Sequence, residues 1–476
     1  MRDILLIAIL MSFIFVNFRV PYFMALGYLW VDFLQPQRMG YYIFNQLPVA
    51  MILGAGALIS YLIFDKEKRF RFSALQALIV TLVAWATIVT YGWGIVADGT
   101  YKWDWATKAL LFAAFLPFVL TTRRRIEAAL AVILFSISAI TISAGVKTLV
   151  GGGGYGNISL LVNNNTGLYE GSTLATTSLA LVPLLWWFYK HNSLMKPSRL
   201  TFLITCGLTL SFGLITIGAE ARTGFVAMGM LALLIWWRSK RKFVSGMALV
   251  IVALVAVPFL PQTFIDRMST LETVSSDKSA STRLAVWAWT LDLVADKPLG
   301  GGFHVFKINK LTINMQRTVT ENGVTDVEEF TATDSARAFH SSYFEVLGEL
   351  GYPGFAIWMT LVIAFFLKTR SIVRAEKRNR TNLPADSPAL ADSDWASSFG
   401  TAMSISVPVY MTGSLTVGIA FSPTFYHLVA LTVAVVFLRE EQVQVAAKSA
   451  RALPKRAGIG SRRRGDDLPG APVPAE

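Results

Sequence analysis

Long apolar stretches alternate with short charged segments along most of this chain. Runs of roughly twenty residues with few charges have the length that a helix needs to cross the hydrocarbon core of a bilayer. The longest runs lie near residues 43–64, 73–96, 126–146, 200–219, 243–260, 343–367 and 398–418. Shorter runs lie near 4–18, 21–35, 106–121, 173–189, 222–237 and 423–438. Because backbone in lipid must satisfy its own hydrogen bonds, the pattern predicts helices, and we expect an all-α polytopic membrane protein.

Two counts of the membrane-spanning helices fit this pattern. Counting every run predicts about thirteen spans and an external N-terminus, whereas joining the first two short runs predicts about twelve spans with both ends inside. The run at 4–18 begins like a secretory signal, but no small-residue cleavage site follows it, and the chain continues through Arg19 and Pro21 into the next run. We therefore expect a retained membrane anchor.

Clusters of Lys and Arg indicate which loops face the cytoplasm. These clusters occupy residues 66–71, 123–125, 190–199, 238–242, 368–380 and 451–464. The segments predicted to be external are 97–105, 150–173, 219–223 and 261–342. The predicted organisation is therefore transmembrane helices at 1–260, a large external loop at 261–342, transmembrane helices at 343–440 and a disordered cytoplasmic tail at 441–476.

The large external loop is too long to be a simple connector. Apolar residues recur at helical spacing after Ser281, a plausible N-cap, and Pro298 with the following glycines ends the pattern. We expect an amphipathic helix here, lying at the outer membrane interface. The polar, acidic stretch 318–333 is predicted to be a mobile lid or insertion, and 378–394 and 448–476 are predicted to be disordered.

Composition agrees with a membrane protein and excludes several other classes. Apolar residues make up 54% of the chain and charged residues 15%, against about 25% charged in soluble domains. The net charge of +13 lies mainly in short loops and the tail, which indicates membrane orientation and not a nucleic-acid-binding face. A single cysteine, Cys206, excludes a disulfide within the chain. Few charges lie inside the apolar runs, whereas an ion-coupled pump usually buries more.

Three residues on the predicted external side could carry chemistry. Arg222 follows Glu220 in a turn between two apolar runs, where it could grip a diphosphate, although snorkelling or an ion pair with Glu220 would also explain it. Arg283 opens the predicted external helix, where a cation opposes the helix dipole, although a solvated surface arginine is the commoner case. His340 precedes a membrane helix, whose positive end would keep the imidazole neutral and available as a base, although a histidine bonded to backbone would fit as well.

These residues lie in motifs that resemble the O-antigen ligase and polymerase superfamily of bacterial envelopes. The motifs are Arg222-Thr223-Gly224; Arg283 with Trp287, Pro298-Leu299-Gly300 and Phe303; and His340-Ser341 with Glu349-Leu350-Gly351 and Gly354. They occur in the family's order within about residues 150–365. The opening Met1–Leu6, the turn Gln35–Arg38 and the run His340–Glu349 look most like the exosortase-associated branch of probable O-glycosylation ligases. That branch tends to have an Asp-Asn-Asn stretch where this chain reads Tyr169–Ala175, which would alter the substrate if the stretch shapes the acceptor or sugar pocket.

The resemblance implies a glycosyltransferase of GT-C-like architecture in the bacterial inner membrane, with its large loop and active site in the periplasm. The implied donor is a glycan on undecaprenyl diphosphate, and the acceptor is a hydroxyl of lipid A core, another glycan or a protein. Arg222 and Arg283 would bind the diphosphate, and His340 would activate the acceptor hydroxyl for inverting attack. Arg337 and Glu349 are further candidate substrate-binding residues. No metal or other cofactor is implied, since the arginines replace the cation.

Other functions remain open at this stage. A polysaccharide polymerase would share this architecture and differ in its acceptor, which the sequence does not reveal. A non-enzymatic polysaccharide transporter or a membrane scaffold would tolerate the loss of Arg222 or His340. A transporter would also be expected to place more polar residues in mid-membrane than this chain does.

Overall fold

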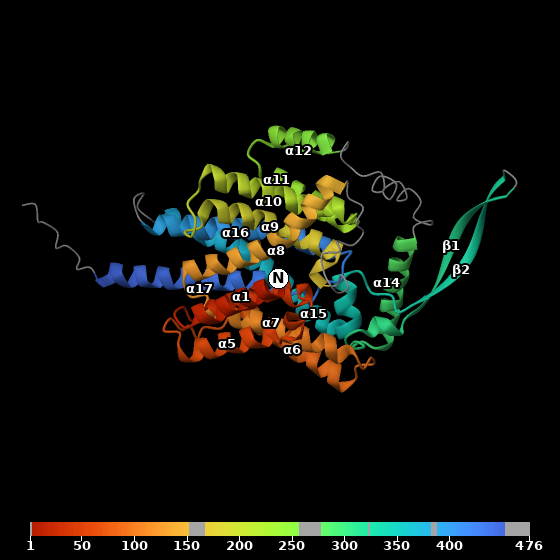
Figure 1. Ribbon diagram of the computed structural model, residues 1–476, viewed down its shortest axis with the longest axis horizontal. Coiled ribbons are helices and arrows are strands. Elements are labelled where there is room, and N and C mark those ends of the chain that lie inside the picture. Colours follow the sequence, from red (N-terminus) through yellow and green to blue (C-terminus); the bar gives the residue numbers. More distant parts are fainter. Residues whose placement is uncertain (1, 152–166, 257–277, 322–323, 382–387, 453–476) are drawn as a thin grey trace, which may run out of the picture. The chain divides into compact units, whose positions relative to one another are not determined.

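The computed structural model describes residues 2–151, 167–256, 278–321, 324–381 and 388–452 (Figure 1). The chain divides into two compact units, Met1–Leu438 and Arg439–Glu476. The first eight helices are α1 (Arg2–Asn17), α2 (Phe23–Leu34), α3 (Pro36–Met39), α4 (Ile43–Gln46), α5 (Val49–Ile63), α6 (Ala74–Gly92), α7 (Gly99–Val119) and α8 (Arg123–Gly151). They are followed by the 3-10 turn η1 (Gly167–Tyr169), α9 (Gly171–His191), α10 (Arg199–Gly218), α11 (Arg222–Arg238) and α12 (Lys242–Ala256).

The remainder mixes helices with one pair of strands. Its elements are α14 (Lys278–Asp296), η4 (Val305–Ile308), β1 (Lys310–Glu321), β2 (Val324–Ser335), α15 (Ser342–Thr381), α16 (Pro388–Gly413) and α17 (Pro423–Ala452). Within the first unit, α16 packs against α15, α9 and α11, while α2 packs against α5 and α8. Large side chains fill the interior between helices; Trp358, Phe365, Trp395 and Tyr426 are all buried.

Several of the helices meet the requirements of a membrane span. Among the described residues, five are long and apolar enough by length and composition: Ala74–Gly92, Arg123–Val150, Gly171–His191, Arg199–Gly218 and Ser342–Arg380. Shorter apolar helices occupy Phe23–Leu34, Val49–Ile63 and Lys242–Ile251. The prediction of a mainly helical, multi-pass membrane protein is therefore confirmed, whereas the count of about twelve or thirteen spans stays a prediction.

The N-terminal helices bear on the two counts that the sequence left open. α1 and α2 are separate helices that pack on each other and do not form one merged unit. The Tyr169 hydroxyl of η1 donates to the Leu34 carbonyl at the end of α2 (2.5 Å), and the charges of Arg2 and Arg38 act on the same tyrosine. The start of α1 therefore lies at the end of the bundle where α2 ends and α9 begins. This arrangement excludes a single merged span, whereas a re-entrant pair and two full spans both fit it, so the count stays a prediction.

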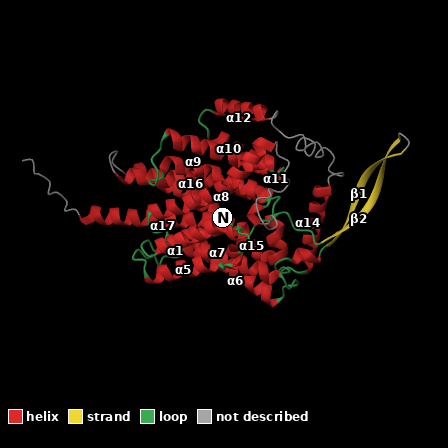
Figure 2. Ribbon diagram, viewed as in Figure 1, coloured by secondary structure: helices red, strands yellow, loops and turns green. Residues whose placement is uncertain are grey.

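The strands correct the all-α prediction. β1 and β2 form an antiparallel hairpin in which Lys310 pairs with Ser335 and Thr318 with Val327 (Figure 2). The chain is thus not all-α, and the described part of 318–333 is paired strand, which agrees with the predicted insertion; a mobile lid stays a prediction. Threonine and valine recur through both strands, and such β-branched residues favour extended backbone. The dipeptide Asn322-Gly323 between the strands is a common hairpin-turn sequence.

Two of the segments predicted to be disordered are partly helical. α15 continues to Thr381 and α16 begins at Pro388, so only 382–387 of the stretch 378–394 lies outside the described residues. α17 likewise extends through the first part of the predicted tail to Ala452, and 453–476 lies outside the described residues. These extensions are rich in Ala, Glu, Lys and Arg, which are good helix formers, and continuing an existing helix needs no new nucleation.

Candidate functional site

His340 is held in an unusual backbone conformation just before α15. Its φ angle is +46°, in the left-handed region that side-chain-bearing residues rarely adopt. The neighbours on either side are fixed, because Phe339 is buried and Ser342 exchanges hydrogen bonds with the loop before α17. In that loop, Val417 accepts from the Ser342 hydroxyl and the Ile419 amide donates to it, both at 2.9 Å. His340 as a whole residue is exposed, although the surrounding protein partly desolvates its ring.

α14 brings Arg283 to this histidine. Trp287, one turn after Arg283, stacks on Phe344 of α15 with ring centroids 4.9 Å apart and planes 4° from parallel. Its indole N–H also donates to the Phe339 carbonyl at 2.9 Å, directly beside His340. The Arg283 charge acts on the imidazole. The predicted helix is confirmed, but it begins at Lys278, so Ser281 is not its N-cap and Arg283 lies in its second turn. Trp287 fastens α14 to α15.

The pKa of His340 lies below its ordinary value. Desolvation by the surrounding protein is the largest cause, followed by the positive charge of Arg283 and, more weakly, that of Arg337. Glu170 opposes them and raises the pKa. These four residues, Glu170, Arg283, Arg337 and His340, are called the His340 cluster below. Its electrostatic balance favours a neutral imidazole, which is the form that can accept a proton.

Arg337 and Glu170 belong to different parts of the chain. Arg337 lies beyond β2, where its guanidinium pairs with Asp334 at 2.5 Å and its backbone is bonded to Asn309. The Asp334 carboxylate raises the pKa of Arg337. Glu170 caps α9 by accepting from the backbone of Ser172 and Thr173 at 3.1 and 2.7 Å. The sequence showed Glu170 only as a charge at the end of a run, and no local pattern linked it to His340.

Arg222 lies at the same end of the bundle. It is the first residue of α11, two residues after Glu220, whose φ angle is +46°. The next residue, Thr223, shares a hydrogen bond of 2.8 Å with Thr416, in the same loop that holds Ser342. Arg222 is therefore tied to the start of α15 through this loop. The structure thus brings Arg283, Arg337 and His340 together and places Arg222 on an adjoining helix start.

Glu349 belongs to a different group. Its carboxylate is fully buried and accepts from the Lys102 ammonium of α7 at 2.7 and 2.9 Å. Glu345 binds the same ammonium at 2.6 Å, and Glu349 also accepts from the His304 amide at 3.0 Å. We call Lys102, Glu345 and Glu349 the Lys102 clamp. The structure does not bring Glu349 into the His340 cluster as the substrate-binding prediction would require, because its oxygens are occupied inside the protein.

The clamp joins three parts of the chain that are distant in sequence. The Lys102 ammonium lies beside the paired rings of Phe303 and Phe421, at 5.2 and 5.0 Å from their centroids, and the Glu345 carboxylate accepts from the Ala420 amide at 3.1 Å. The apolar pattern predicts an external loop at 97–105 and gives Lys102 no role, whereas α7 begins at Gly99 and buries this lysine. The sequence offered one signal for this burial: Lys102 lies beside Trp103 and Trp105, just before the apolar run at 106–121.

The Pro298-Leu299-Gly300 motif packs against a bend in α15. Gly351 has φ +65° and breaks the helix, and the Tyr352 amide donates to the Pro298 carbonyl at 2.9 Å. Gly300, with φ +92°, faces this bend, and its carbonyl accepts from Trp93 at 3.2 Å. Both glycines adopt backbone that other residues strongly disfavour. The motif therefore sets where α14 ends relative to α15, and so where Arg283 lies relative to His340.

Among the described residues, no group of three or more His, Cys, Asp or Glu side chains could hold a metal ion. The cluster offers positive charge for an anion and a neutral base beside it. Arginine suits this role because its guanidinium stays charged and can bind a phosphate with two parallel hydrogen bonds. The arrangement could therefore bind a phosphate-bearing substrate and accept a proton from a hydroxyl group next to it.

Two protein-family models match separate parts of the chain. Residues 1–193 match a family of unknown function (DUF5935), and residues 207–359 match the O-antigen ligase family. No match was found among curated proteins. The second match contains the predicted site residues: Arg222, Arg283, Arg337, His340 and Glu349. Residues 207–359 therefore form an O-antigen ligase family domain, which confirms the predicted resemblance to the O-antigen ligase and polymerase superfamily.

Proposed function

We propose that this protein is a glycan ligase that transfers an oligosaccharide or polysaccharide from a lipid diphosphate to an acceptor hydroxyl. The observation that carries the proposal is the approach of Arg283 to His340 across two elements of the O-antigen ligase domain. The donor is undecaprenyl diphosphate bearing the glycan, and the acceptor is a hydroxyl of lipid A core, a glycan or a protein. The reaction takes place on the periplasmic face of the inner membrane.

In this mechanism His340 acts as the general base. Its neutral imidazole removes the proton from the acceptor hydroxyl as that oxygen attacks the anomeric carbon of the donor sugar. The bond between the anomeric carbon and the phosphate oxygen breaks, and the diphosphate leaves with the bonding electron pair. Attack from the face opposite the leaving group inverts the anomeric configuration.

The arginines stabilise the leaving group. Arg283 and Arg222 bind the diphosphate and offset the negative charge that grows on it in the transition state. Such preorganised charges are effective because they do not have to reorient during the reaction. Arg337 extends the positive surface and is restrained by Asp334. Glu349 acts indirectly, because the Lys102 clamp positions the first part of α15, immediately after His340.

The same organisation supports the finer topology proposed here. The site is formed at the starts of α9, α11 and α15. Each of these helices follows a segment predicted to be external, and none follows a Lys/Arg cluster, which supports a site on the external side. An external N-terminus and thirteen spans are consistent with the beginning of α1 near Tyr169. Membership of the exosortase-associated branch stays a prediction.

Transfer by the purified, reconstituted protein tests the proposal. The donor is a glycan on undecaprenyl diphosphate, and lipid A core, glycan and protein acceptors are supplied in separate reactions. His340→Ala is expected to reduce transfer at least about 100-fold, the usual contribution of a general base, without altering the melting temperature. Lys307→Ala is the matched control, because Lys307 is a partly exposed residue of the same region outside the His340 cluster.

Undiminished transfer by His340→Ala would remove the base assignment. Extension of the donor glycan by the same glycan units, with no transfer to other acceptors, would identify a polymerase instead of a ligase. Transport of the lipid-linked glycan that persists in His340→Ala and Arg283→Ala, with no transfer by the wild-type protein, would identify a transporter.

A further inference from the structure

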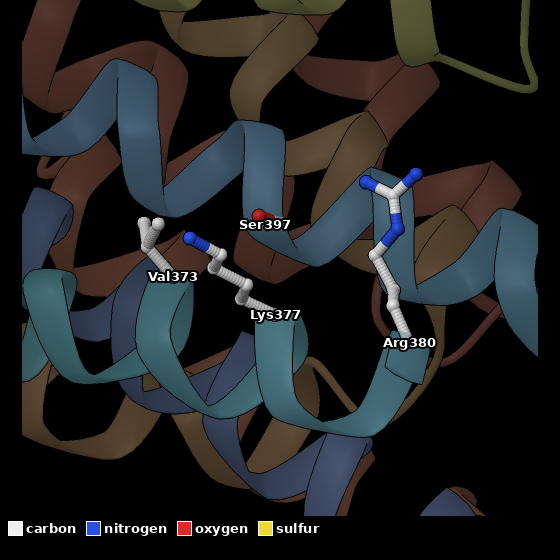
Figure 3. A pocket seen from close by; sticks show the side chains of 4 residues that line it. All are labelled: Val373, Lys377, Arg380 and Ser397. Carbon is white, nitrogen blue, oxygen red and sulfur yellow. The ribbon is translucent and has the colours of Figure 1, made fainter. Parts of the chain in front are cut away.

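A hollow lies between α15 and α16 at the end of α15 opposite His340. Its volume is about 440 Å³, and it is lined by Val373, Lys377, Arg380 and Ser397. Figure 3 shows Lys377 and Arg380 rising from α15 toward α16, with Ser397 beside the lysine. A second hollow of about 360 Å³ shares two of these residues; it is lined by His191, Arg380, Asp394, Ser397, Ser398 and Thr401. We call the two together the Arg380 hollow.

The position of the hollow along α15 corresponds to the edge of a membrane. With a rise of 1.5 Å per residue, Val373 lies about 33 Å and Arg380 about 44 Å beyond the bend at Gly351. A bilayer has a hydrocarbon core of about 30 Å and measures about 40–45 Å with its headgroups. The apolar part of α15 begins near the bend, so the Arg380 hollow lies where the hydrocarbon gives way to headgroups.

Two buried tryptophans support one wall of the hollow. Trp187 of α9 donates to Ser398, a lining residue, at 3.0 Å and to the Trp395 carbonyl at 3.2 Å. The Trp395 ring packs on Trp187, with centroids 5.6 Å apart, and both side chains are buried between the helices. They hold α9 and α16 in place beside the hollow, while the distance along α15 assigns the hollow to the headgroup region.

The lining has the chemistry of a phosphate site. Among the residues that the structure describes, Lys377 has no ion-pair partner. Arg380 pairs with Asp394 at 2.5 Å, but both side chains are nearly half exposed (46% and 45%), and exposed ion pairs of this kind are weak enough to exchange. A guanidinium, an ammonium and a serine hydroxyl thus line one hollow, and all three are common phosphate ligands.

We propose that the Arg380 hollow binds the phosphate of an anionic membrane phospholipid. The headgroup would lie between Lys377 and Arg380, and Ser397 would donate to it, while the acyl chains would follow the apolar part of α15 into the bilayer. A lipid is favoured over a soluble phosphate because the hollow opens at headgroup depth and is bounded on one side by the apolar Val373. This site is separate from glycan transfer and is at the opposite end of α15.

The test measures lipid binding to the full-length protein in detergent. Phosphatidylglycerol is added to the purified wild-type protein and to the double variant Lys377→Met/Arg380→Gln, and the melting temperature is followed at increasing lipid concentration. Ser397→Ala serves as a milder second variant. Lys368→Met is the matched control. Lys368 is also on α15 but does not line the hollow, and it lies on the face of the helix opposite to Lys377.

Phosphatidylglycerol is expected to raise the melting temperature of the wild-type protein and of Lys368→Met. The double variant should require about tenfold or more lipid for the same rise, which corresponds to losing charge-assisted hydrogen bonds, and Ser397→Ala should show a smaller loss. Equal responses in all variants, or an equal response to phosphatidylcholine, would overturn the proposal. A rise produced by inorganic phosphate alone, and lost in the double variant, would replace the lipid with a soluble anion and also overturn it. If the double variant fails to fold, the response of Ser397→Ala relative to Lys368→Met decides.

Discussion

The Lys102 clamp and the His340 cluster lie near the same end of α15 but treat charge in opposite ways. In the clamp, two carboxylates surround one ammonium, and all three side chains are buried, with 6%, 8% and 0% exposure for Lys102, Glu345 and Glu349. In the cluster, two guanidinium charges act on an exposed histidine and lower its pKa. Complementary buried charges hold helices together, whereas gathered like charges are favourable only when an anion arrives. The difference separates the residues that build the site from those that use it.

Breaking the clamp is expected to have the largest effect. Glu349→Ala leaves Lys102 buried with one carboxylate fewer and deprives the His304 amide of its acceptor. Removing one partner of a buried ion pair typically costs about 3–5 kcal/mol, so we expect the free energy of unfolding to fall by that order. Unfolding of the purified protein in detergent measures the change. A loss of transfer with unchanged stability would instead place Glu349 among the substrate-binding residues.

Changes to the two arginines of the cluster come next. Arg283→Lys should lower transfer about tenfold or more, because an ammonium cannot make two parallel hydrogen bonds to a phosphate. Arg337→Lys should lower transfer by less than about threefold, because the charge is retained and the residue is already engaged with Asp334. Steady-state rates with the lipid-diphosphate donor distinguish the two. Equal losses of transfer in the two variants would contradict the prediction that Arg283 contributes more to diphosphate binding than Arg337.

The pH dependence of transfer gives a smaller and more specific test. Because the pKa of His340 is lowered, the neutral base persists below pH 6.5, and activity should decline only as the pH falls further. Arg283→Met removes a neighbour that lowers this pKa, so the acid limb of kcat/KM should move to higher pH. Glu170→Gln removes the neighbour that raises the pKa, so the limb should move to lower pH. Shifts in the same direction for both variants would contradict the proposed electrostatics.

The smallest effect is expected at an exposed counterpart of the clamp. Lys108 and Asp104 form an ion pair of 2.7 Å on α7, the helix that also carries Lys102, but their side chains are 63% and 52% exposed. Asp104→Asn should change the free energy of unfolding by only about 0.5 kcal/mol or less. The comparison with Glu349→Ala uses the same helix and the same type of contact. A large loss here would show that burial is not what makes the clamp strong.

The sequence predicted the helical part of the fold well. Apolar runs set by the thickness of a bilayer are strong local signals, and helices occupy the predicted runs from Arg2–Asn17 to Pro423–Ala452. The hairpin of β1 and β2 was missed because its polar alternating residues also suit a solvated loop. The helical ends of α15 and α17 were missed because charge and proline content suggested disorder, while continuation of an existing helix decided the outcome.

The candidate site was predictable only in part. Arg283 and His340 belong to motifs with a recognisable order, and the structure brings them together. Glu170 and Lys102 come from segments more than 100 and 200 residues away from their partners, so no local pattern could join them. Glu349 lies in the same motif as His340, but its side chain is on the face of α15 that packs toward Lys102 of α7, so it is buried. Such pairings depend on tertiary packing and not on spacing along the chain.

The bend at Gly351 has a consequence for mutational screens of this protein. A Cβ atom at Gly351 would overlap the Pro298 carbonyl and the Gly300 amide, and one at Gly300 would overlap Gly351 in return. Either substitution would push the end of α14 away from α15 and carry Arg283 away from His340, although neither glycine touches a glycan. Random mutagenesis should therefore yield inactive clones at these two glycines as readily as at the histidine. A map of inactive positions would consequently outline a larger patch than the one the sugar contacts.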